Sequence, residues 1–261
     1  MVIFFMKVLI TGAASGIGYL TALTLAERKH EVYLTCENSK QVKNVKEKVL
    51  DYKNVKVIKV NITKEEDRKK VLELDVDCLI CNAAIAQGGS IIEANLDKVR
   101  ENFEVNVFSN FELVKEVLKQ MVEKDKGKIV MMSSLISSIP LPFTGIYSAT
   151  KASISNITYA LQKELWLMGS SVSISLVEPG LYHTGFNQVL LENKYDNGEY
   201  FDDIKKELYN VEHFIFNVLE KKKLDSIVVQ IVRATEDKRP KKVYRAPFLQ
   251  SKLAKIYSLF K

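Results

Sequence analysis

Short apolar runs alternate with longer amphipathic segments along this chain from residue 7 to residue 177. The runs hold four to six residues and are rich in valine, isoleucine and leucine, which is typical of buried β-strands. We expect strands at 7–11, 31–35, 55–60, 78–81, 128–132 and 172–177. The segments between them carry apolar residues at helical spacing and predict helices at 17–28, 39–52, 65–74, 99–124 and 147–167.

Strands that alternate with long helices form βαβ units, which build a parallel sheet covered on both faces. We therefore expect an α/β fold with one doubly wound parallel sheet, in a single domain spanning residues 1–261. In such sheets ligands bind beyond the carboxyl ends of the strands. The residues that follow each strand are therefore the candidates for function.

A glycine-rich loop follows the first expected strand. Gly12, Gly16 and Gly18 lie in the segment Thr-Gly-Ala-Ala-Ser-Gly-Ile-Gly, which runs directly into a helix. Glycine permits a tight turn and a close approach to a ligand, and a helix N-terminus attracts phosphate groups. The loop alone also allows a packed turn without a ligand.

A tyrosine and a lysine share one face of a later helix. Tyr147 and Lys151 are four residues apart, so the ammonium lies within reach of the phenol ring. A nearby ammonium favours the phenolate and lowers the tyrosine pKa, which predicts a general acid/base. Ser134, after the fifth strand, offers a hydroxyl to hold a reacting oxygen. Taken separately, the pair also fits a half-buried aromatic and a snorkelling lysine.

Together these motifs resemble the short-chain dehydrogenase/reductase family. The matching segments are TGAASGIG at 11–18, NAA at 82–84, Asn106, Ser134, YSATK at 147–151 and PGLYHT at 179–184. The resemblance covers residues 7 to 184. It implies a Rossmann-type sheet that binds NAD or NADP, and hydride transfer to a carbonyl group or from an alcohol.

The resemblance also implies a role for individual residues. Tyr147 exchanges the proton, Lys151 lowers its pKa and holds the nicotinamide ribose, Ser134 positions the substrate oxygen and Asn106 supports a proton relay. The implied cofactor-binding residues are Gly12, Ser15, Gly16, Ile17, Gly18, Glu37, Asn61, Ile62, Asn82, Ala83, Tyr147, Lys151, Pro179, Gly180 and Thr184. No metal site is expected.

Two departures from the family pattern concern the cofactor. The usual Asn-Ala-Gly triplet reads Asn82-Ala83-Ala84, and one extra methyl group is expected to be tolerated. NAD-preferring members usually have aspartate at the position of Cys36, whereas NADP-preferring members often have a basic residue at that of Glu37 or Ser15. Because a carboxylate would repel a 2′-phosphate, we expect NAD rather than NADP. The positive charges of Lys40 and Lys43 would offset this repulsion, so NADP remains the alternative cofactor.

Residues 185–224 are predicted to form a helical lid over the substrate. Their many apolar side chains, together with the apolar segment 139–143, favour an apolar carbonyl or alcohol larger than acetaldehyde. Two ordinary packed helices are the alternative. The residues do not distinguish steroid, retinoid, acyl and xenobiotic carbonyl compounds.

The net charge of +6 is concentrated at the C-terminus. Residues 238–261 hold eight basic and no acidic residues, whereas the rest has a net charge of −2. We expect a strand at 242–245 and a helix from Pro247, with one apolar face formed by Leu249, Leu253, Ile256, Tyr257 and Phe260. Docking of that face on the body or on a partner subunit is one interpretation, and peripheral contact with an anionic membrane is the other.

Nucleic-acid binding is not expected, because the nearly neutral body offers no broad basic face. Cys36, Cys78 and Cys81 are too few for a disulfide framework or a zinc site and are predicted to be buried. They fit a reducing cytosol, and residues 1–6 lack a signal peptide's leading charge and read as an early strand. We expect a cytoplasmic oxidoreductase that forms a homodimer through the helices at 99–124 and 147–167. A non-catalytic dinucleotide sensor or scaffold is the alternative.

Overall fold

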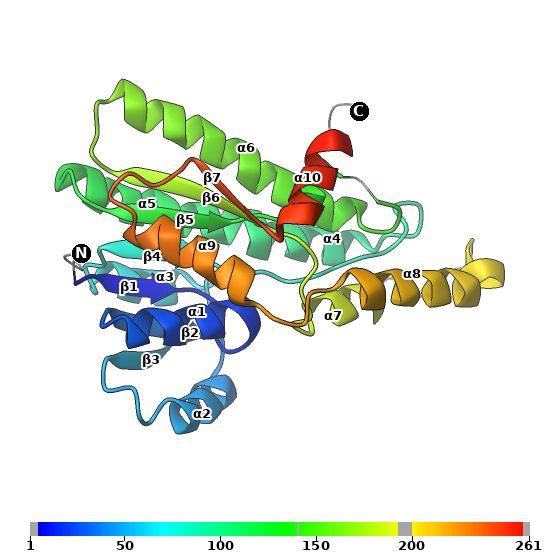
Figure 1. Cartoon of the computed structure of the whole chain (residues 1–261), viewed down its shortest axis with the longest axis horizontal. Coiled ribbons are helices and arrows are strands. Elements are labelled where there is room, and N and C mark those ends of the chain that lie inside the picture. The colour runs from blue at the N-terminus through cyan, green and yellow to red at the C-terminus, as the bar shows by residue number, and fades with distance from the viewer. Residues whose placement is uncertain (1–4, 140, 193–199, 258–261) are drawn as a thin grey trace.

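A computed structural model describes residues 5–139, 141–192 and 200–257. Seven parallel strands form one sheet in the order β3-β2-β1-β4-β5-β6-β7 (Figure 1). The strands are β1 (Lys7–Ile10), β2 (Glu31–Cys36), β3 (Val55–Lys59), β4 (Cys78–Cys81), β5 (Lys128–Met132), β6 (Ser173–Pro179) and β7 (Val243–Ala246). The structure thus confirms the doubly wound parallel sheet of the Rossmann type, in a single domain.

Helices cover both faces of the sheet (Figure 1). Apolar side chains of α1, α2 and α9 pack on one face, and those of α3, α5 and α6 pack on the other. The helices are α1 (Gly16–Glu27), α2 (Ser39–Lys48), α3 (Glu65–Leu72), α4 (Leu96–Phe103), α5 (Ser109–Glu123), α6 (Gly145–Leu167), α7 (Phe186–Glu192), α8 (Lys205–Leu219), α9 (Asp225–Glu236) and α10 (Phe248–Tyr257). The shorter turns within the described ranges are the π-helix η1 (Glu104–Phe108) and the 3-10 helices η2 (Leu135–Ser138) and η4 (Asp202–Ile204).

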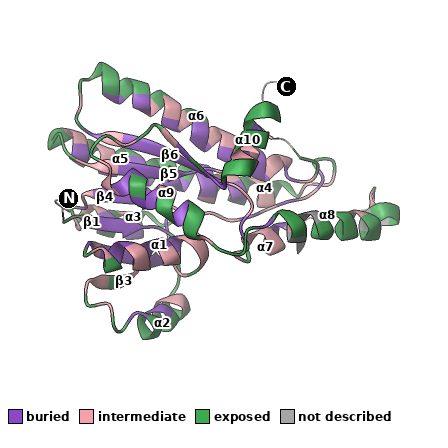
Figure 2. Cartoon of the chain, viewed as in Figure 1, coloured by how far each residue is buried: buried purple, intermediate pink, exposed green. Residues whose placement is uncertain are grey.

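The central strands β1, β2, β4, β5 and β6 are buried on both sides, as their continuous apolar runs predict, whereas the edge strands β3 and β7 also carry exposed residues (Figure 2). Cys78 faces the core under α1 and α9, whereas Cys81 faces the core under α5 and α6. Residues an odd number of positions apart in a strand point to opposite sides, so this pair cannot form a shared site. All three cysteines are free and buried, and burial raises the pKa of Cys36 to about 11.

Several sequence expectations need correction. The helix expected at 99–124 is three pieces, because a π-turn at 104–108 separates α4 from α5. Helix α9 was not among the expected elements, although its buried residues recur at helical spacing. The early strand expected at 1–6 is wrong for residues 5 and 6, since β1 begins at Lys7, and residues 1–4 lie outside the described part.

The topology fixes where a ligand can bind. β1 and β4 are neighbours, so the chain reverses direction across the sheet between them. The loops after these strands meet at the carboxyl edge, which is the ligand-binding position in doubly wound sheets. From the end of β6 the chain continues into α7 and then into α8, which projects away from the body (Figure 1). No helix in the described ranges has the length and apolar character to cross a membrane.

Candidate active site

The glycine loop is clamped against the segment that follows β4. The Thr11 hydroxyl accepts hydrogen bonds from the backbone N–H groups of Asn82 and Ala83, each at 3.0 Å. The Asn82 amide donates back to the carbonyl oxygens of Thr11 and Gly12 at 3.0 and 2.9 Å. A Cβ on Gly12, at φ +61°, would lie 2.7 Å from the Cα of Ala83, so glycine is required.

The start of α1 is open to an anionic ligand. Ser15 is the N-cap, but its side chain makes no capping hydrogen bond, and the first turn has no acidic residue. A Cβ on Gly16 would lie 3.3 Å from Thr184, which places this distant residue over the loop. A Cβ on Gly18 would lie 2.5 Å from the Asn82 amide nitrogen. Free N–H groups at this end suit phosphate oxygens.

The ends of β2 and β3 lie side by side, because Cys36 pairs with Lys59 in the sheet. Cys36 is buried, whereas Glu37 is exposed and its N–H donates to the Gln41 side chain at 2.9 Å. Asn61 accepts hydrogen bonds from both the N–H and the hydroxyl of Thr63. The Ile62 side chain packs into the core, so only its backbone can face a ligand.

Ser134 and the end of β6 are in direct contact. The Ser134 hydroxyl donates to the carbonyl oxygen of Pro179 at 3.3 Å and accepts from the N–H of Ile136. The neighbouring Ser133 hydroxyl donates to the carbonyl oxygen of Lys151 at 2.8 Å. Gly180 donates to Ala246 at 2.7 Å, which fixes the turn after β6.

Tyr147 and Lys151 lie on the buried face of α6, as their spacing predicts. The Lys151 Nζ atom is 5.7 Å from the centre of the Tyr147 ring and donates to the carbonyl oxygen of Met132 at 3.1 Å. Both residues are more than nine-tenths buried. Burial lowers the pKa of Lys151 to about 8.

The tyrosine pKa differs from the sequence expectation. Burial raises the pKa of Tyr147 well above its usual value, whereas the sequence predicted a decrease caused by Lys151. Phe186 of α7 explains the difference, because its ring lies 5.6 Å from the Tyr147 ring and helps exclude water. Leu190, Ala86 and Ile136 complete this apolar cover.

Asn106 lies in the π-turn and joins three segments. Its side-chain oxygen accepts from the N–H of Ile85 at 2.8 Å, and its amide nitrogen donates to the carbonyl oxygen of Ile85 at 2.9 Å. The same nitrogen lies within hydrogen-bond distance of Asn102 and of the Thr150 hydroxyl. Thr150 stands between Tyr147 and Lys151 in α6, so Asn106 ties the loop after β4 to α6.

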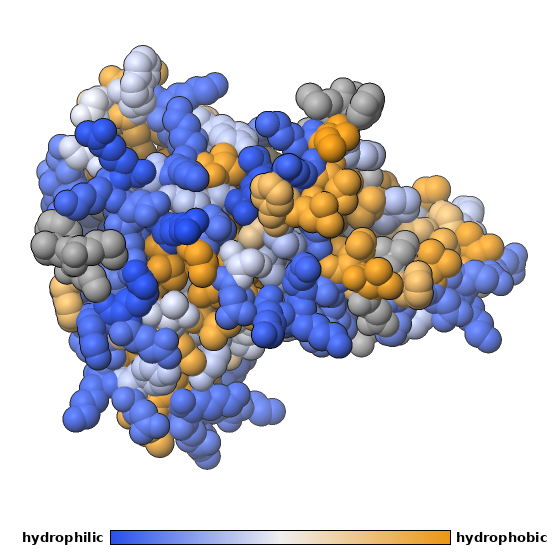
Figure 3. Space-filling model, in the orientation of Figure 1, coloured by the Kyte–Doolittle hydropathy of each residue, from blue (hydrophilic) through white to orange (hydrophobic). Residues whose placement is uncertain are grey.

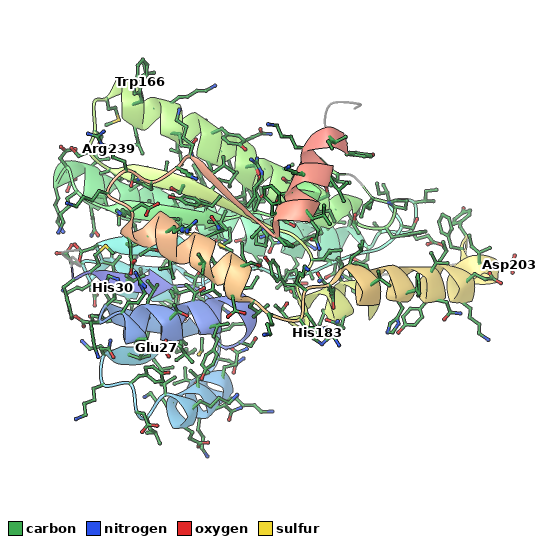
Figure 4. The ribbon with its side chains drawn as sticks, viewed as in Figure 1. Glu27, His30, Trp166, His183, Asp203 and Arg239 are labelled. Carbon is green, nitrogen blue, oxygen red and sulfur yellow. The ribbon has the colours of Figure 1, made fainter. Side chains whose placement is uncertain are left out.

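A buried carboxylate holds the end of α8 next to the start of α7. Glu220 accepts from the Asn187 amide at 2.7 Å and pairs with His183 Nδ1 at 2.8 Å. His183 lies in the turn between β6 and α7 (Figure 4). Sequence reasoning missed this cluster, because its members become neighbours only when α8 returns to the turn after β6.

Comparison with known proteins identifies the family. Residues 6–195 match the family model for short chain dehydrogenase. A 3-ketodihydrosphingosine reductase of Bacteroides thetaiotaomicron is 32% identical over 231 residues, which is 86% of this chain and 82% of that protein. The chain belongs to the short-chain dehydrogenase/reductase family. It is therefore an oxidoreductase of that family.

Solved structures agree with this fold. A short-chain dehydrogenase/reductase of Burkholderia phymatum in complex with NAD matches with a TM-score of 0.79 at 20% identity, covering 93% of this chain and 90% of that one. The closed form of a serine dehydrogenase complexed with NADP+ matches with a TM-score of 0.78 at 22% identity, covering 94% and 96%.

In this short-chain dehydrogenase/reductase the expected site residues fall into three groups along the carboxyl edge. Ser134, Tyr147 and Lys151 lie around the ends of β5 and β6, and Asn106 reaches α6 through Thr150. The glycine loop lies with Asn82, Ala83 and Thr184. Glu37 and Asn61 follow β2 and β3 at one end of the edge. Their individual roles stay predictions.

Proposed function

We propose that this enzyme transfers a hydride between NAD and an apolar carbonyl compound or secondary alcohol, with Tyr147 as the general acid/base. The observation that carries the proposal is the buried Tyr147–Lys151 pair, which lies with Ser134 at the ends of β5 and β6 on the same sheet edge as the uncapped start of α1. A sensor without chemistry has no need of this acid/base set.

The nicotinamide cofactor, when bound, supplies or accepts the hydride. The residues present fit such a group, because the N-terminus of α1 has no side-chain cap and no acidic residue in its first turn. Gly12, Ser15, Ile17 and Gly18 would line the pyrophosphate side. Lys151 would hold the nicotinamide ribose, and Thr184 with the backbone at Pro179 and Gly180 would hold the carboxamide.

Tyr147 holds the proton that a carbonyl oxygen needs on reduction. Its raised pKa keeps the phenol protonated at neutral pH, which suits the role of an acid. The Ser134 hydroxyl would hold the same oxygen as negative charge develops on it. Lys151 stabilises the phenolate after the proton has left, and Asn106 keeps the loop after β4 in place beside α6.

The preference for NAD rests on the end of β2. Glu37 is exposed there and stands where a 2′-phosphate would approach, so its carboxylate favours ribose hydroxyls and repels the phosphate. Lys40 and Lys43 are exposed on α2 and are the nearest candidates to offset that repulsion.

The substrate class follows from the apolar cover of Tyr147. Phe186 and Leu190 from α7, within the proposed lid of residues 185–224, present carbon rather than charge to the phenol. A relative named for the reduction of a keto compound supports a ketone substrate. Charged small hydroxy acids would lose their solvation here without a partner.

We also propose a cytoplasmic homodimer. Phe108 and Phe111 are large exposed side chains on the π-turn and α5, and Trp166 is exposed at the end of α6 (Figure 4). Exposed aromatic groups of this kind mark interaction surfaces. Sedimentation velocity of Phe108→Asp/Phe111→Asp, compared with the wild type, tests the dimer. A wild-type monomer would contradict it.

The direct test of the reaction is a turnover panel with NADH and NADPH as separate cofactors. We expect reduction of apolar ketones, with a lower KM for NADH than for NADPH. Activity confined to small charged hydroxy acids would contradict the substrate class, and clearly better use of NADPH would contradict the cofactor preference. Binding of a cofactor without turnover of any compound would favour a sensor.

A further inference from the structure

The face of α10 that the sequence predicts to be apolar points away from the protein. Leu249, Leu253 and Ile256 fall on one side of the helix and are 68%, 57% and 52% exposed. The opposite side packs on the body through Ala254 and Gln250. Docking of this face on the body is therefore wrong for the described residues of α10. Phe260, which the sequence placed on the same face, lies outside the described residues.

A second exposed apolar set lies beside the first one. Phe214, Val218 and Leu219 in the C-terminal half of α8 are 68%, 64% and 45% exposed. The Gln250 amide of α10 donates to the carbonyl oxygen of Leu219 at 2.8 Å, which joins the two helices. Figure 3 shows hydrophobic residues gathered over α10 and along α8. We call these six side chains the α8–α10 surface.

The border of the α8–α10 surface is basic. Lys221, Lys222 and Lys223 follow α8, and Lys252 and Lys255 lie on α10, and all five are exposed. Between residues 213 and 224 the only acidic residue is Glu220, which is buried and paired with His183. Residues 246–257 contain no acidic residue. The exposed Asp225 follows this lysine run, so acidic charge is outnumbered rather than absent along the border. An apolar centre with a mainly basic border complements anionic lipid headgroups above an apolar layer.

A second copy of the chain is a poorer occupant. In a two-fold symmetric dimer the same patch meets itself, so the lysines around one copy would face the lysines of the other. The like charges would repel, whereas anionic headgroups would neutralise them.

We propose that the α8–α10 surface binds the protein peripherally to anionic lipid bilayers, with the apolar side chains inserted at the headgroup boundary and the five lysines on the headgroups. The proposal goes beyond the proposed reaction and does not depend on it.

Vesicle sedimentation of the whole protein tests this proposal. The vesicles are phosphatidylcholine with and without phosphatidylglycerol, at low and high salt. We expect pelleting with phosphatidylglycerol vesicles that weakens as salt rises. Leu249→Ser/Leu253→Ser and Lys222→Glu/Lys252→Glu should each reduce the partition coefficient about tenfold. The matched controls are the exposed Leu50→Ser and Lys48→Glu/Lys53→Glu, and both should pellet like the wild type.

Each alternative result overturns the proposal. The proposal fails if the protein does not pellet, or if it pellets equally without phosphatidylglycerol. It also fails if Leu249→Ser/Leu253→Ser or Lys222→Glu/Lys252→Glu pellets like the wild type. Sedimentation velocity without vesicles adds one more outcome: an oligomer that Leu249→Ser/Leu253→Ser dissociates would assign the surface to a second copy. Circular dichroism melting verifies folding, and the lysine variant carries the test if the serine variant does not fold.

Discussion

At the scale of single residues, Lys151 combines a proposed catalytic role with an energetic cost. Its ammonium is buried beside Tyr147 and satisfied by one carbonyl oxygen, that of Met132. Burial disfavours the charged form, which is why its pKa falls to about 8 from an ordinary value near 10.5. Active sites hold such groups at the expense of stability.

Lys151→Met should therefore stabilise the protein while it impairs turnover. At pH 7 the wild type keeps a buried charge, which costs about 3 kcal/mol from the pKa difference, and the lost Met132 hydrogen bond offsets about 1 kcal/mol. The net gain of about 2 kcal/mol should be complete below pH 8. It should shrink as pH rises towards 10.5, because the unfolded wild type then also loses its proton. Denaturant melts at pH 7 and pH 10 measure it, and a variant less stable at pH 7 would contradict the burial argument.

Glu37 is the residue on which the proposed preference for NAD depends. Replacing its exposed carboxylate with a cation removes the repulsion of a 2′-phosphate and adds an attraction. Glu37→Arg should improve kcat/KM for NADPH relative to NADH by about tenfold or more. Glu47→Arg, exposed on α2, is the matched charge control and should leave the ratio unchanged. An unchanged ratio in Glu37→Arg would show that another residue reads the ribose.

At the scale of elements, the cluster around Glu220 holds the end of α8 to the turn before α7. It connects His183 and Asn187 through one buried carboxylate. Removing that carboxylate takes away the acceptor of His183 and one of the two acceptors of Asn187, and leaves the backbone bonds of Lys221 as the link between the end of α8 and this turn. Phe186 and Leu190 of α7 cover Tyr147, so the position of this cover depends on the Glu220 cluster.

Glu220→Ala should raise KM for an apolar ketone about tenfold and lower cofactor affinity by a smaller factor, because the cluster is linked to the glycine loop only indirectly, through Thr184 beside His183. Steady-state kinetics and a cofactor titration measure the two effects separately. Glu207→Ala, exposed on the same helix, is the control. Equal loss of cofactor and substrate binding would show that the cluster supports the whole site rather than the lid.

The sequence predicted the elements that repeat a pattern and missed those that depend on partners. The apolar runs predicted the strands closely, and the spacing of Tyr147 and Lys151 placed both on one face of α6. The π-turn at Asn106 does not show in the hydrophobic periodicity. It is stabilised by hydrogen bonds between the Asn106 side chain and the backbone of Ile85, which lies in another part of the chain. The predicted direction of the Tyr147 pKa shift was wrong for the same reason, since Phe186, Leu190 and Ala86 from other parts of the chain contribute to the burial of its ring.

At the scale of the whole molecule, one ion-pair cluster joins the connection between α1 and β2 to the C-terminal end of α9. Glu236 at the end of α9 accepts two hydrogen bonds from Arg28 and one from the buried His30. Burial alone would raise the pKa of Glu236, but the bonds from Arg28 and His30 outweigh burial and hold it below its usual value.

Glu236→Gln should therefore destabilise the fold by about 2 kcal/mol at pH 7, which is the scale of hydrogen bonds to a charged group. The difference should vanish in acid, because the wild-type carboxylate gains its proton as pH falls below the unfolded value of 4.5 and through the lower folded pKa. Urea melts of both proteins from pH 7 to pH 3 check this. A difference that persists at the acid end would point to packing instead of charge.

The central claim is that one site binds the cofactor and that Tyr147 performs the proton transfer. The most direct test measures NADH binding by fluorescence and turnover of an apolar ketone in the same preparations of wild type and Tyr147→Phe. We expect equal NADH affinity in the two proteins and a turnover reduced by about 100-fold or more in the variant. Turnover within tenfold of the wild type, or absence of NADH and NADPH binding by the wild type, would contradict it.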